Sequence, residues 1–433
     1  MIIDLTFMIL ITISATVFFW AFYHLPILAA GVKDLIKNRE KHDNQITLGK
    51  FLPTCTIIVP VKNEEKVVNR LLVSLSKLNY PNSKKEVVVV EDGSSDKTLE
   101  ICLNYAKNNT NVKVFHRNSS TGKASALNYG LKYSKGDIIA VFDADSVPDP
   151  NVLRNMCSYF DDQNVAAVQG KTLSINSKQN MLTQFISYEG AVYNEVYLRG
   201  KDVLNLFVHL TGSCQFVRRD VIVELEGFDE KVLSEDIELS ARLTKNNYKI
   251  RYAPNVIAWQ ESPSKIKTLF KQRTRWFRGV TELAFKYGTL MGKLNWKNLD
   301  AEATLFAPFI LIASFFPYLV TGYTFFTIIP FDIFWSYAVQ FATIATTLSL
   351  LLCGFSLVFV TKPRRIKNAL WLPFVYFYWS FQAFVALYAI FLIALRRPKQ
   401  WTRTARSGVI DDSSDCPLHS TVNYNTSEEI VRC

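Results

Sequence analysis

The sequence of 433 residues has few cysteines, and they are not arranged in pairs. Its seven cysteines are odd in number and scattered along the chain, without the close spacing of zinc ligands. Zinc modules and disulfide frameworks both need paired cysteines, so neither is expected. Reduced thiols are typical of proteins that face the cytosol, and we expect this chain to do so.

Charge is also scarce, because only 20% of the residues are charged while 49% are hydrophobic and 13% aromatic. Residues 5–30 contain no Lys, Arg, Asp or Glu, and further apolar runs cover residues 302–329, 334–360 and 370–395. About 20 apolar residues suffice to cross a bilayer as a helix. The sequence therefore predicts an N-terminal transmembrane helix within residues 1–35 and about three C-terminal ones within residues 300–396. A cleaved signal peptide is the alternative for the first run, but that run is too long and no basic residue precedes it.

The sequence lacks the interleaving of basic and aromatic residues that is typical of nucleic-acid-binding surfaces. Much of the formal net charge of +11 lies beside the apolar runs, at residues 362–367 and 396–406. Cytoplasmic loops next to membrane helices carry excess Lys and Arg, so the expected partner is anionic membrane lipid and not nucleic acid. We expect an integral protein of the plasma membrane whose catalytic domain is cytosolic.

The number of crossings leaves the topology open. If the first helix runs from outside to inside, three C-terminal crossings place the basic tail outside, against its charge. Either one C-terminal run is not a full crossing, or the tail is an exception. Residues 407–433, rich in Ser, Asp and Thr, are expected to form a flexible tail.

Between the apolar ends, residues 50–260 have ordinary polarity and alternating strand and helix patterns. Residues 54–60 and 86–90 are strand-like runs separated by a helical stretch over residues 64–78, which predicts a parallel unit of an α/β domain. A third run, residues 137–142, has the continuous apolar character of a strand buried on both faces.

Three carboxylates follow these predicted strands. Asp92 comes after the second strand, and Asp143 and Asp145 come after the third. Ligands of such open sheets bind at the carboxyl ends of the strands, so the three side chains are expected to converge on one pocket. One Asp of an Asp-x-Asp pair can bind a nucleotide ribose and the other a divalent cation, which neutralises charge on a departing diphosphate. An Asp-rich turn is the alternative interpretation of Asp143 and Asp145.

Two further features suit transfer chemistry. Lys123 opens a predicted helix behind Gly122, where an ammonium group can reach phosphate. Glu235 and Asp236 lie where a loop leads into a helix, and a helix N-terminus favours an anionic carboxylate. A positioned carboxylate can remove the proton of an attacking hydroxyl, so Asp236 is the predicted base and Glu235 the second choice. Simple helix capping is the alternative.

Residues 263–280 contain six basic residues and no acidic one, with apolar residues at helical spacing. This pattern predicts an amphipathic helix at the membrane interface, within a region spanning residues 261–295. Gln272, Arg275 and Trp276 are three and four positions apart and therefore on one side of the helix. Arginine can bind phosphate through two hydrogen bonds, and an indole can stack on a sugar ring.

Four of these features, in order along the chain, resemble the pattern D, DxD, (T)ED and QxxRW. They are Asp92, the Asp143-Ala144-Asp145 triplet, Ser234-Glu235-Asp236 and the segment from Gln272 to Trp276. The chain is similar to glycosyltransferase family 2, in its membrane-embedded branch of cellulose, chitin, hyaluronan and poly-N-acetylglucosamine synthases. The resemblance covers about residues 52–406. It implies an α/β fold: an A-type nucleotide-sugar glycosyltransferase domain with a mostly parallel sheet, plus transmembrane and interfacial helices.

The resemblance also implies roles for these residues. On the donor side, Asp92 would bind the uracil or ribose and Asp143 the nucleotide, Lys123 would lie near the diphosphate, and Asp145 would hold Mg²⁺ or Mn²⁺. Asp236 would be the base. The diphosphate and the acceptor would be held by Gln272, Arg275 and Trp276, with Cys214 and Glu235 also on the acceptor side.

The implied enzyme is an inverting, metal-dependent glycosyltransferase that takes a sugar from a UDP-hexose or UDP-N-acetylhexosamine and extends a β-linked polysaccharide. One alternative is a single addition to a lipid acceptor, and another is a membrane glycan-binding subunit without catalysis. Ser234 stands where the family usually has Thr, a mild change. The membrane portion is smaller than in well-known polymer synthases, so a partner subunit or a homo-oligomer is a further expectation.

Overall fold

The computed structural model describes residues 2–37, 52–118, 122–288, 295–313, 366–399 and 403–411, with a few isolated positions between 340 and 351 and residues 416–417. The strands are β1 (Cys55–Val61), β2 (Lys85–Glu91), β3 (Val112–His116), β4 (Ile138–Val141), β5 (Val147–Pro148), β6 (Val165–Ser174), β7 (Gln215–Arg218) and β8 (Lys249–Gln260). The helices of the sheet domain are α3 (Val68–Ser76), α4 (Thr98–Lys107), α5 (Lys123–Tyr133), α6 (Val152–Cys157), α9 (Arg219–Glu224) and α10 (Glu235–Lys245).

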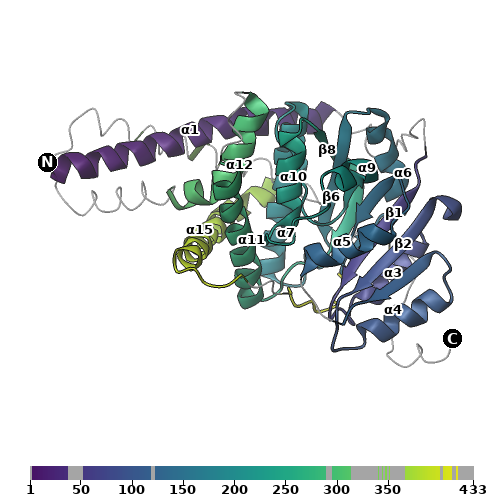
Figure 1. The fold of residues 1–433 in the computed structure, drawn as a ribbon. Helices are drawn as coiled ribbons and strands as arrows, with labels where there is room; N and C mark the ends of the chain where they lie inside the picture. Colours follow the sequence, from purple (N-terminus) through teal and green to yellow (C-terminus); the bar gives the residue numbers. More distant parts are fainter. Residues whose placement is uncertain are drawn as a thin grey trace.

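The remaining helices lie mostly at the other end of the molecule (Figure 1). They are α1 (Ile2–Lys37), α7 (Met181–Val192), the π-helical segment η3 (Tyr193–Leu198), α8 (Arg199–Val203), α11 (Ile266–Tyr287), α12 (Trp296–Ala313) and α15 (Leu372–Ala394). Short 3-10 turns span Asn82–Lys84, Ser158–Asp161 and Ile366–Trp371. The chain runs from α7 through η3 into α8 without a break.

The strands form one eight-stranded sheet in the order β3-β2-β1-β4-β7-β6-β8-β5. The β3-β2-β1-β4 half is parallel, as the apolar runs predicted. The other half is mixed, because β7 lies antiparallel to both β4 and β6, and β5 antiparallel to β8, whereas β6 and β8 are parallel. The expectation of a mostly parallel sheet therefore holds for the first half alone, and the α/β domain has a mixed sheet.

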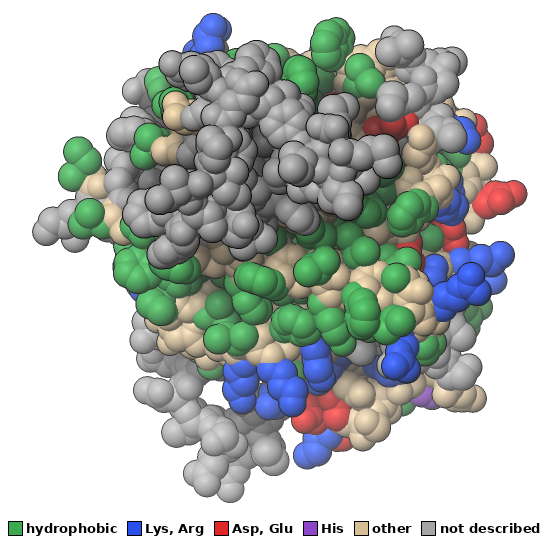
Figure 2. All heavy atoms as spheres, turned by 90° about the vertical axis from the view of Figure 1, so that its left-hand side faces the viewer, with side chains coloured by type: hydrophobic (Ala, Val, Ile, Leu, Met, Phe, Trp, Pro, Cys, Tyr) green, Lys and Arg blue, Asp and Glu red, His purple; other side chains and the backbone are tan. Residues whose placement is uncertain are grey.

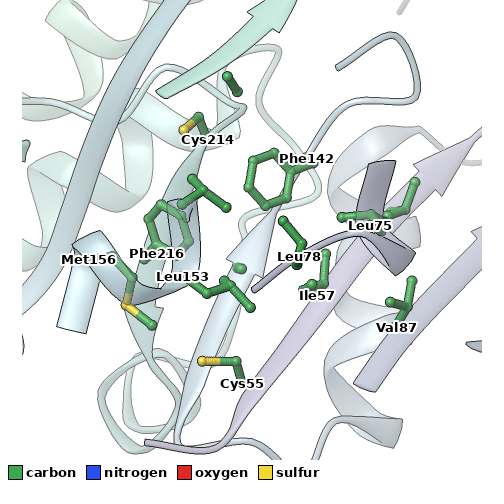
Figure 3. Packing of buried hydrophobic residues seen from close by; sticks show 14 of the residues in the cluster. Cys55, Ile57, Leu75, Leu78, Val87, Phe142, Leu153, Met156, Cys214 and Phe216 are labelled. Carbon is green, nitrogen blue, oxygen red and sulfur yellow. The ribbon is translucent and has the colours of Figure 1, made fainter. Parts of the chain in front are cut away.

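Alternate side chains of the central strands enter two different cores, as the period of a strand requires. Ile57 and Val87 point to the side covered by α3, α4 and α6 and belong to one buried cluster with Leu75 and Met156 (Figure 3). The other face is covered by α5, α9 and α10, and Ile58 belongs to that cluster. Both faces are buried, so the carboxyl ends of the strands are the part of the sheet open to a ligand.

The long helix α1 packs against η3 and α8 with its backbone in close contact. A Cβ atom on Gly31 would lie 2.0 Å from the carbonyl oxygen of Val196, and one on Gly200 would lie 1.9 Å from that of Ile27. Asp34 also pairs with Arg199 at 3.0 Å. Glycine is required at both positions because any side chain would separate the helices.

No helix in the described part of the chain is both long enough and apolar enough to cross a membrane. The predicted crossings at residues 5–30 and 370–395 correspond to α1 and α15, which are helical but do not support a transmembrane assignment. The predicted crossings at 302–329 and 334–360 lie largely outside the described residues.

Candidate functional site

A cavity of about 1490 Å³ opens at the carboxyl ends of the strands and extends to α1. It brings together residues that are far apart in the sequence, from α5, the loop after β4, α10 and α11. Among its lining residues are most of those predicted from the sequence: Lys123, Asp143, Glu235, Asp236, Gln272, Arg275 and Trp276. Seven of the predicted site residues therefore share one cavity, but of the three carboxylates expected to converge at the strand ends only Asp143 lines it.

Lys123 connects the two acidic segments of the cavity. Its Nζ atom lies 2.6 Å from Asp143 Oδ1 and 3.5 Å from Glu235 Oε1, and it donates a hydrogen bond to the carbonyl of Gly212 at 2.8 Å. Burial acts to lower the pKa of Lys123, but the Asp143 and Glu235 carboxylates outweigh it and raise that pKa. The ammonium group is thus a fixed positive charge.

Asp236 lies at the start of α10, as predicted, with Ile237 N–H donating to its Oδ1 at 2.9 Å. Burial, followed by repulsion from Glu235, raises the pKa of Asp236 to about 7, although Lys123 acts in the opposite sense. Gly212 approaches closely, since a Cβ there would lie 3.1 Å from both Asp236 Oδ2 and Lys123 Nζ. A carboxyl group with this pKa can accept a proton near neutral pH.

Arg275 on α11 interacts electrostatically with this acidic group. Within the described residues no ion pair involves Arg275, and its Nε atom is buried without a hydrogen bond. Burial lowers the pKa of Arg275, while Glu235, Asp236 and Asp143 act to raise it. Because an arginine stays charged in proteins, its unused donors can bind an anion such as a diphosphate. Gln272, one turn earlier, reaches Thr404 at 3.5 Å.

Asp145 does not line the cavity and is paired with a segment that follows α15. Its Oδ2 lies 3.1 Å from Arg406 Nη2 and accepts a hydrogen bond from Glu261 N–H at 3.1 Å. Burial raises the pKa of Asp145 in spite of the guanidinium of Arg406. The same segment continues at Ser407, whose N–H and hydroxyl both bind Glu261. The predicted tail from residue 407 therefore begins with residues that contact the catalytic domain.

No group of three or more His, Cys, Asp or Glu side chains in the described part of the chain is arranged to hold a metal ion. Asp143 and Asp145 are nevertheless two carboxylates of one loop, and Mg²⁺ typically takes one or two carboxylates together with phosphate oxygens and water. Asp143 pairs with Lys123 and Asp145 with Arg406, so both carboxylates are paired with basic side chains in this structure.

Besides Asp145, two predicted site residues, Asp92 and Cys214, lie outside the cavity lining. Asp92, the residue that directly follows β2, is buried with Arg117 3.4 Å from its Oδ1, and it is not among the cavity-lining residues. Cys214 is fully buried in the core on the α3 side of the sheet, with its Sγ directed at the carbonyl of Val256. The acceptor role predicted for Cys214 thus has no support from its position.

A family model matches the part of the chain that forms the sheet, the acidic loops and the basic helix. The model described as "Glycosyltransferase like family 2" matches residues 53–279, which include every element from β1 to the Arg275 segment. The chain belongs to this family. The resemblance of the motifs to glycosyltransferase family 2 is therefore confirmed, and the chain is a glycosyltransferase.

Relatives of this glycosyltransferase have different names. It is 31% identical to "Probable glycosyltransferase YdaM" of Bacillus subtilis, over 64% of this chain and 67% of the relative. It is 33% identical to "Beta-monoglucosyldiacylglycerol synthase" of Trichormus variabilis, over 62% of this chain and 57% of that protein. It is 27% identical to "Poly-beta-1,6-N-acetyl-D-glucosamine synthase" of Staphylococcus epidermidis, over 83% of this chain and 89% of that protein. The match to the second of these spans less than two thirds of its length.

A solved structure shares the fold of the glycosyltransferase. The mannosyltransferase PcManGT of Pyrobaculum calidifontis, in complex with GDP-Man and Mn²⁺, superposes with a TM-score of 0.57 over 90% of this chain and 100% of that one, at 18% identity. This likeness supports the A-type α/β fold, and its low identity carries no conclusion about the substrate.

Several residues at the site of the glycosyltransferase were not predicted. Arg406 and Glu261 are joined to Asp145, and Glu189 on α7 holds Arg273 of the basic helix. Glu189 follows no strand and belongs to no motif, so only the packing of α7 on α11 reveals it. Arg406 is one of several basic residues after the last apolar run, and nothing in the sequence distinguishes it from the others.

Proposed function

We propose that this glycosyltransferase is an inverting, metal-dependent enzyme that moves a sugar from a nucleotide donor, a UDP-hexose or UDP-N-acetylhexosamine, to an acceptor hydroxyl, and extends a β-linked glycan. One observation carries the proposal. Asp236, whose pKa is raised to about 7, lines the same cavity as Arg275, whose buried Nε donor has no hydrogen-bond partner among the described residues. A base and an anion-binding group within one cavity are what displacement of a diphosphate requires.

The mechanism assigns one step to each group. Asp236 removes the proton of the acceptor hydroxyl as its oxygen attacks the anomeric carbon. The bond to the diphosphate breaks on the opposite face, which inverts the anomeric configuration. Arg275 and Lys123 stabilise the negative charge that collects on the leaving diphosphate. A cation held by Asp143 and Asp145 would supply further neutralisation of that charge.

We also propose that the catalytic domain lies on the cytosolic side of the plasma membrane, held there by the apolar segments. Figure 2 shows hydrophobic side chains gathered in a band on one face, with a row of Lys and Arg along its border. Large apolar side chains of α15 are exposed, among them Phe374, Phe377, Phe384 and Phe391. Lys267 and Lys271 of α11 are exposed as well. An apolar surface bordered by basic residues suits an anionic bilayer.

Two acceptor classes fit the proposal. A growing polysaccharide is favoured by the length of the match to the poly-N-acetylglucosamine synthase, which covers 89% of that protein. A lipid acceptor is favoured by the higher identity to the beta-monoglucosyldiacylglycerol synthase. If the product is a polymer, we propose that a partner subunit or a second copy of the chain completes its path across the membrane.

The test is a product assay with purified protein in lipid vesicles. The protein is incubated with each of a panel of labelled UDP- and GDP-sugars, with Mg²⁺, Mn²⁺ or EDTA, and the product is sized. Transfer from one UDP-sugar that stops with EDTA is expected, and a ladder of lengths identifies polymer extension while a single lipid-soluble product identifies lipid transfer. No transfer from any donor, or transfer that persists in EDTA, would contradict the proposed reaction.

A further inference from the structure

Three helices meet at the carboxylate of Glu189, at the edge of the cavity. Its Oε2 accepts hydrogen bonds from Arg273 of α11 at 2.5 Å and from the hydroxyl of Tyr378 of α15 at 2.9 Å. Its Oε1 accepts one from Gln382 Nε2 at 2.6 Å. Glu189, Arg273 and Gln382 all line the cavity. A carboxylate that accepts from three donors on two other helices has little freedom to move.

Arg273, held by Glu189, lies against the ring of Trp276. The guanidinium carbon of Arg273 lies 4.4 Å from the centroid of the Trp276 ring. Burial acts to lower the pKa of Arg273, but the carboxylate of Glu189 outweighs it and raises that pKa. A planar, charged guanidinium that is held in place stacks well on an indole face. The ring of Trp276 remains 40% exposed and lines the cavity.

We propose that Glu189 is a positioning residue for acceptor binding: it fixes Arg273, and Arg273 fixes the indole plane of Trp276 on which a sugar ring of the acceptor stacks. This inference rests on the proposed function, because that function requires a sugar-binding surface beside the base. The occupant is a pyranose ring whose C–H face packs on the indole. The role of Glu189 in this proposal is to hold Arg273, not to act on the reacting atoms.

Arg275, the donor-side arginine of α11, has different charged neighbours from Arg273. Arg275 is two positions from Arg273, and residues two apart on a helix do not share a face. The acidic residues that act on Arg275 are Glu235, Asp236 and Asp143, whereas Arg273 is paired with Glu189. A change at Glu189 should therefore weaken acceptor binding without weakening donor binding.

The experiment compares Glu189→Gln and Arg273→Lys with the wild type in vesicles. The donor is UDP-N-acetylglucosamine or UDP-glucose, whichever turns over, and the acceptors are an N-acetylglucosamine tetramer and diacylglycerol. We expect the acceptor KM to rise about tenfold in both variants, while the donor KM and the hydrolysis of donor without acceptor stay within about twofold of wild type. Arg273→Lys keeps the charge pair, so it reports on the ring contact even if Glu189→Gln folds poorly.

Two controls separate positioning from a structural role. Glu282→Gln makes the same substitution opposite another arginine of α11, Arg278, at 3.0 Å, and it should leave the acceptor KM unchanged. In a Trp276→Ala background, Glu189→Gln should have no further effect on the acceptor KM, because residues that act through one another are not additive.

The outcomes are distinguishable from those of the proposed function. Normal turnover with an unchanged acceptor KM, an equal rise in the donor KM, or a full effect of Glu189→Gln in the Trp276→Ala background would overturn this inference alone. Absence of donor turnover in the wild type would contradict the proposed function and this inference with it.

Discussion

Asp236 is the residue on which the chemistry depends, and its environment predicts a pH dependence. A base acts only when deprotonated, and the pKa of Asp236 is raised to about 7 by burial and by Glu235. We expect kcat/KM to fall about tenfold per pH unit below pH 7 and to level off above it. The measurement is the initial rate of transfer between pH 5 and 9 at saturating metal. A flat profile from pH 5 upward would show that Asp236 is already ionised there or is not the base.

Arg275 gives a second prediction at the residue scale. Arg275→Lys keeps the positive charge but loses the two parallel hydrogen bonds that a guanidinium offers a phosphate. One hydrogen bond to a charged group is worth about 2 kcal/mol, so we expect about thirtyfold weaker binding of UDP with Mg²⁺. Isothermal titration calorimetry measures it directly. Arg154→Lys, on α6 and outside the cavity lining, is the matched control and should bind UDP like the wild type.

Residue types and spacing predicted most of the cavity, but not all of it. Lys123, Asp143, Glu235, Asp236 and Arg275 are near helix starts, at strand ends or at helical spacing, and these local features fix where side chains lie. The contacts of Arg406 and Glu189 depend on segments separated by many residues. No local pattern encodes such contacts, so the sequence alone could not predict them.

At the scale of elements, the sequence predicts β1, β2 and β4, but not β3 or the strands of the mixed half of the sheet. β1, β2 and β4 are continuous apolar runs, fully paired inside the sheet, and their limits agree with the predicted ones within about one residue. β8 has 12 residues, and several of them are only half-buried. Its pairing with β6 is interrupted by two shifts of register. Irregular burial of this kind gives no clear period, so neither strand was expected.

The contact of α1 with η3 and α8 predicts the effect of adding a single methyl group. Gly200→Ala would place a Cβ 1.9 Å from the carbonyl of Ile27, whereas the space beside Gly190 is open within 4 Å. We expect Gly200→Ala to lower the free energy of unfolding by about 1–3 kcal/mol. Gly190→Ala, in a helix, should be neutral or stabilising by up to about 1 kcal/mol.

Thermal unfolding of both variants, together with protease cleavage within α1, checks this prediction. Gly200→Ala should also make α1 more accessible to protease, because the helix can no longer approach α8. Equal melting temperatures for the two variants would mean that α1 does not pack as described.

At the scale of the whole molecule, the distribution of exposed apolar and basic residues predicts binding to anionic lipid. Each Lys near an anionic surface contributes about 1 kcal/mol, so replacing exposed Lys267 and Lys271 by Gln should weaken binding to phosphatidylserine vesicles about thirtyfold. Co-sedimentation with vesicles of increasing phosphatidylserine content measures this. Replacing Lys107 and Lys245, exposed at the ends of α4 and α10, is the control. An equal loss with either pair would show that net charge, and not this face, determines binding.

The measurement that tests the central claim most directly compares donor binding with transfer in Asp236→Asn. UDP binding with Mg²⁺ is measured by calorimetry and transfer by product formation, with Asp220→Asn as a control on an exposed aspartate in the first turn of α9. The account predicts that Asp236→Asn binds UDP within about twofold of wild type while transfer falls at least about a hundredfold, and that Asp220→Asn changes neither. Retained transfer in Asp236→Asn would contradict the assignment of the base and with it the proposed mechanism.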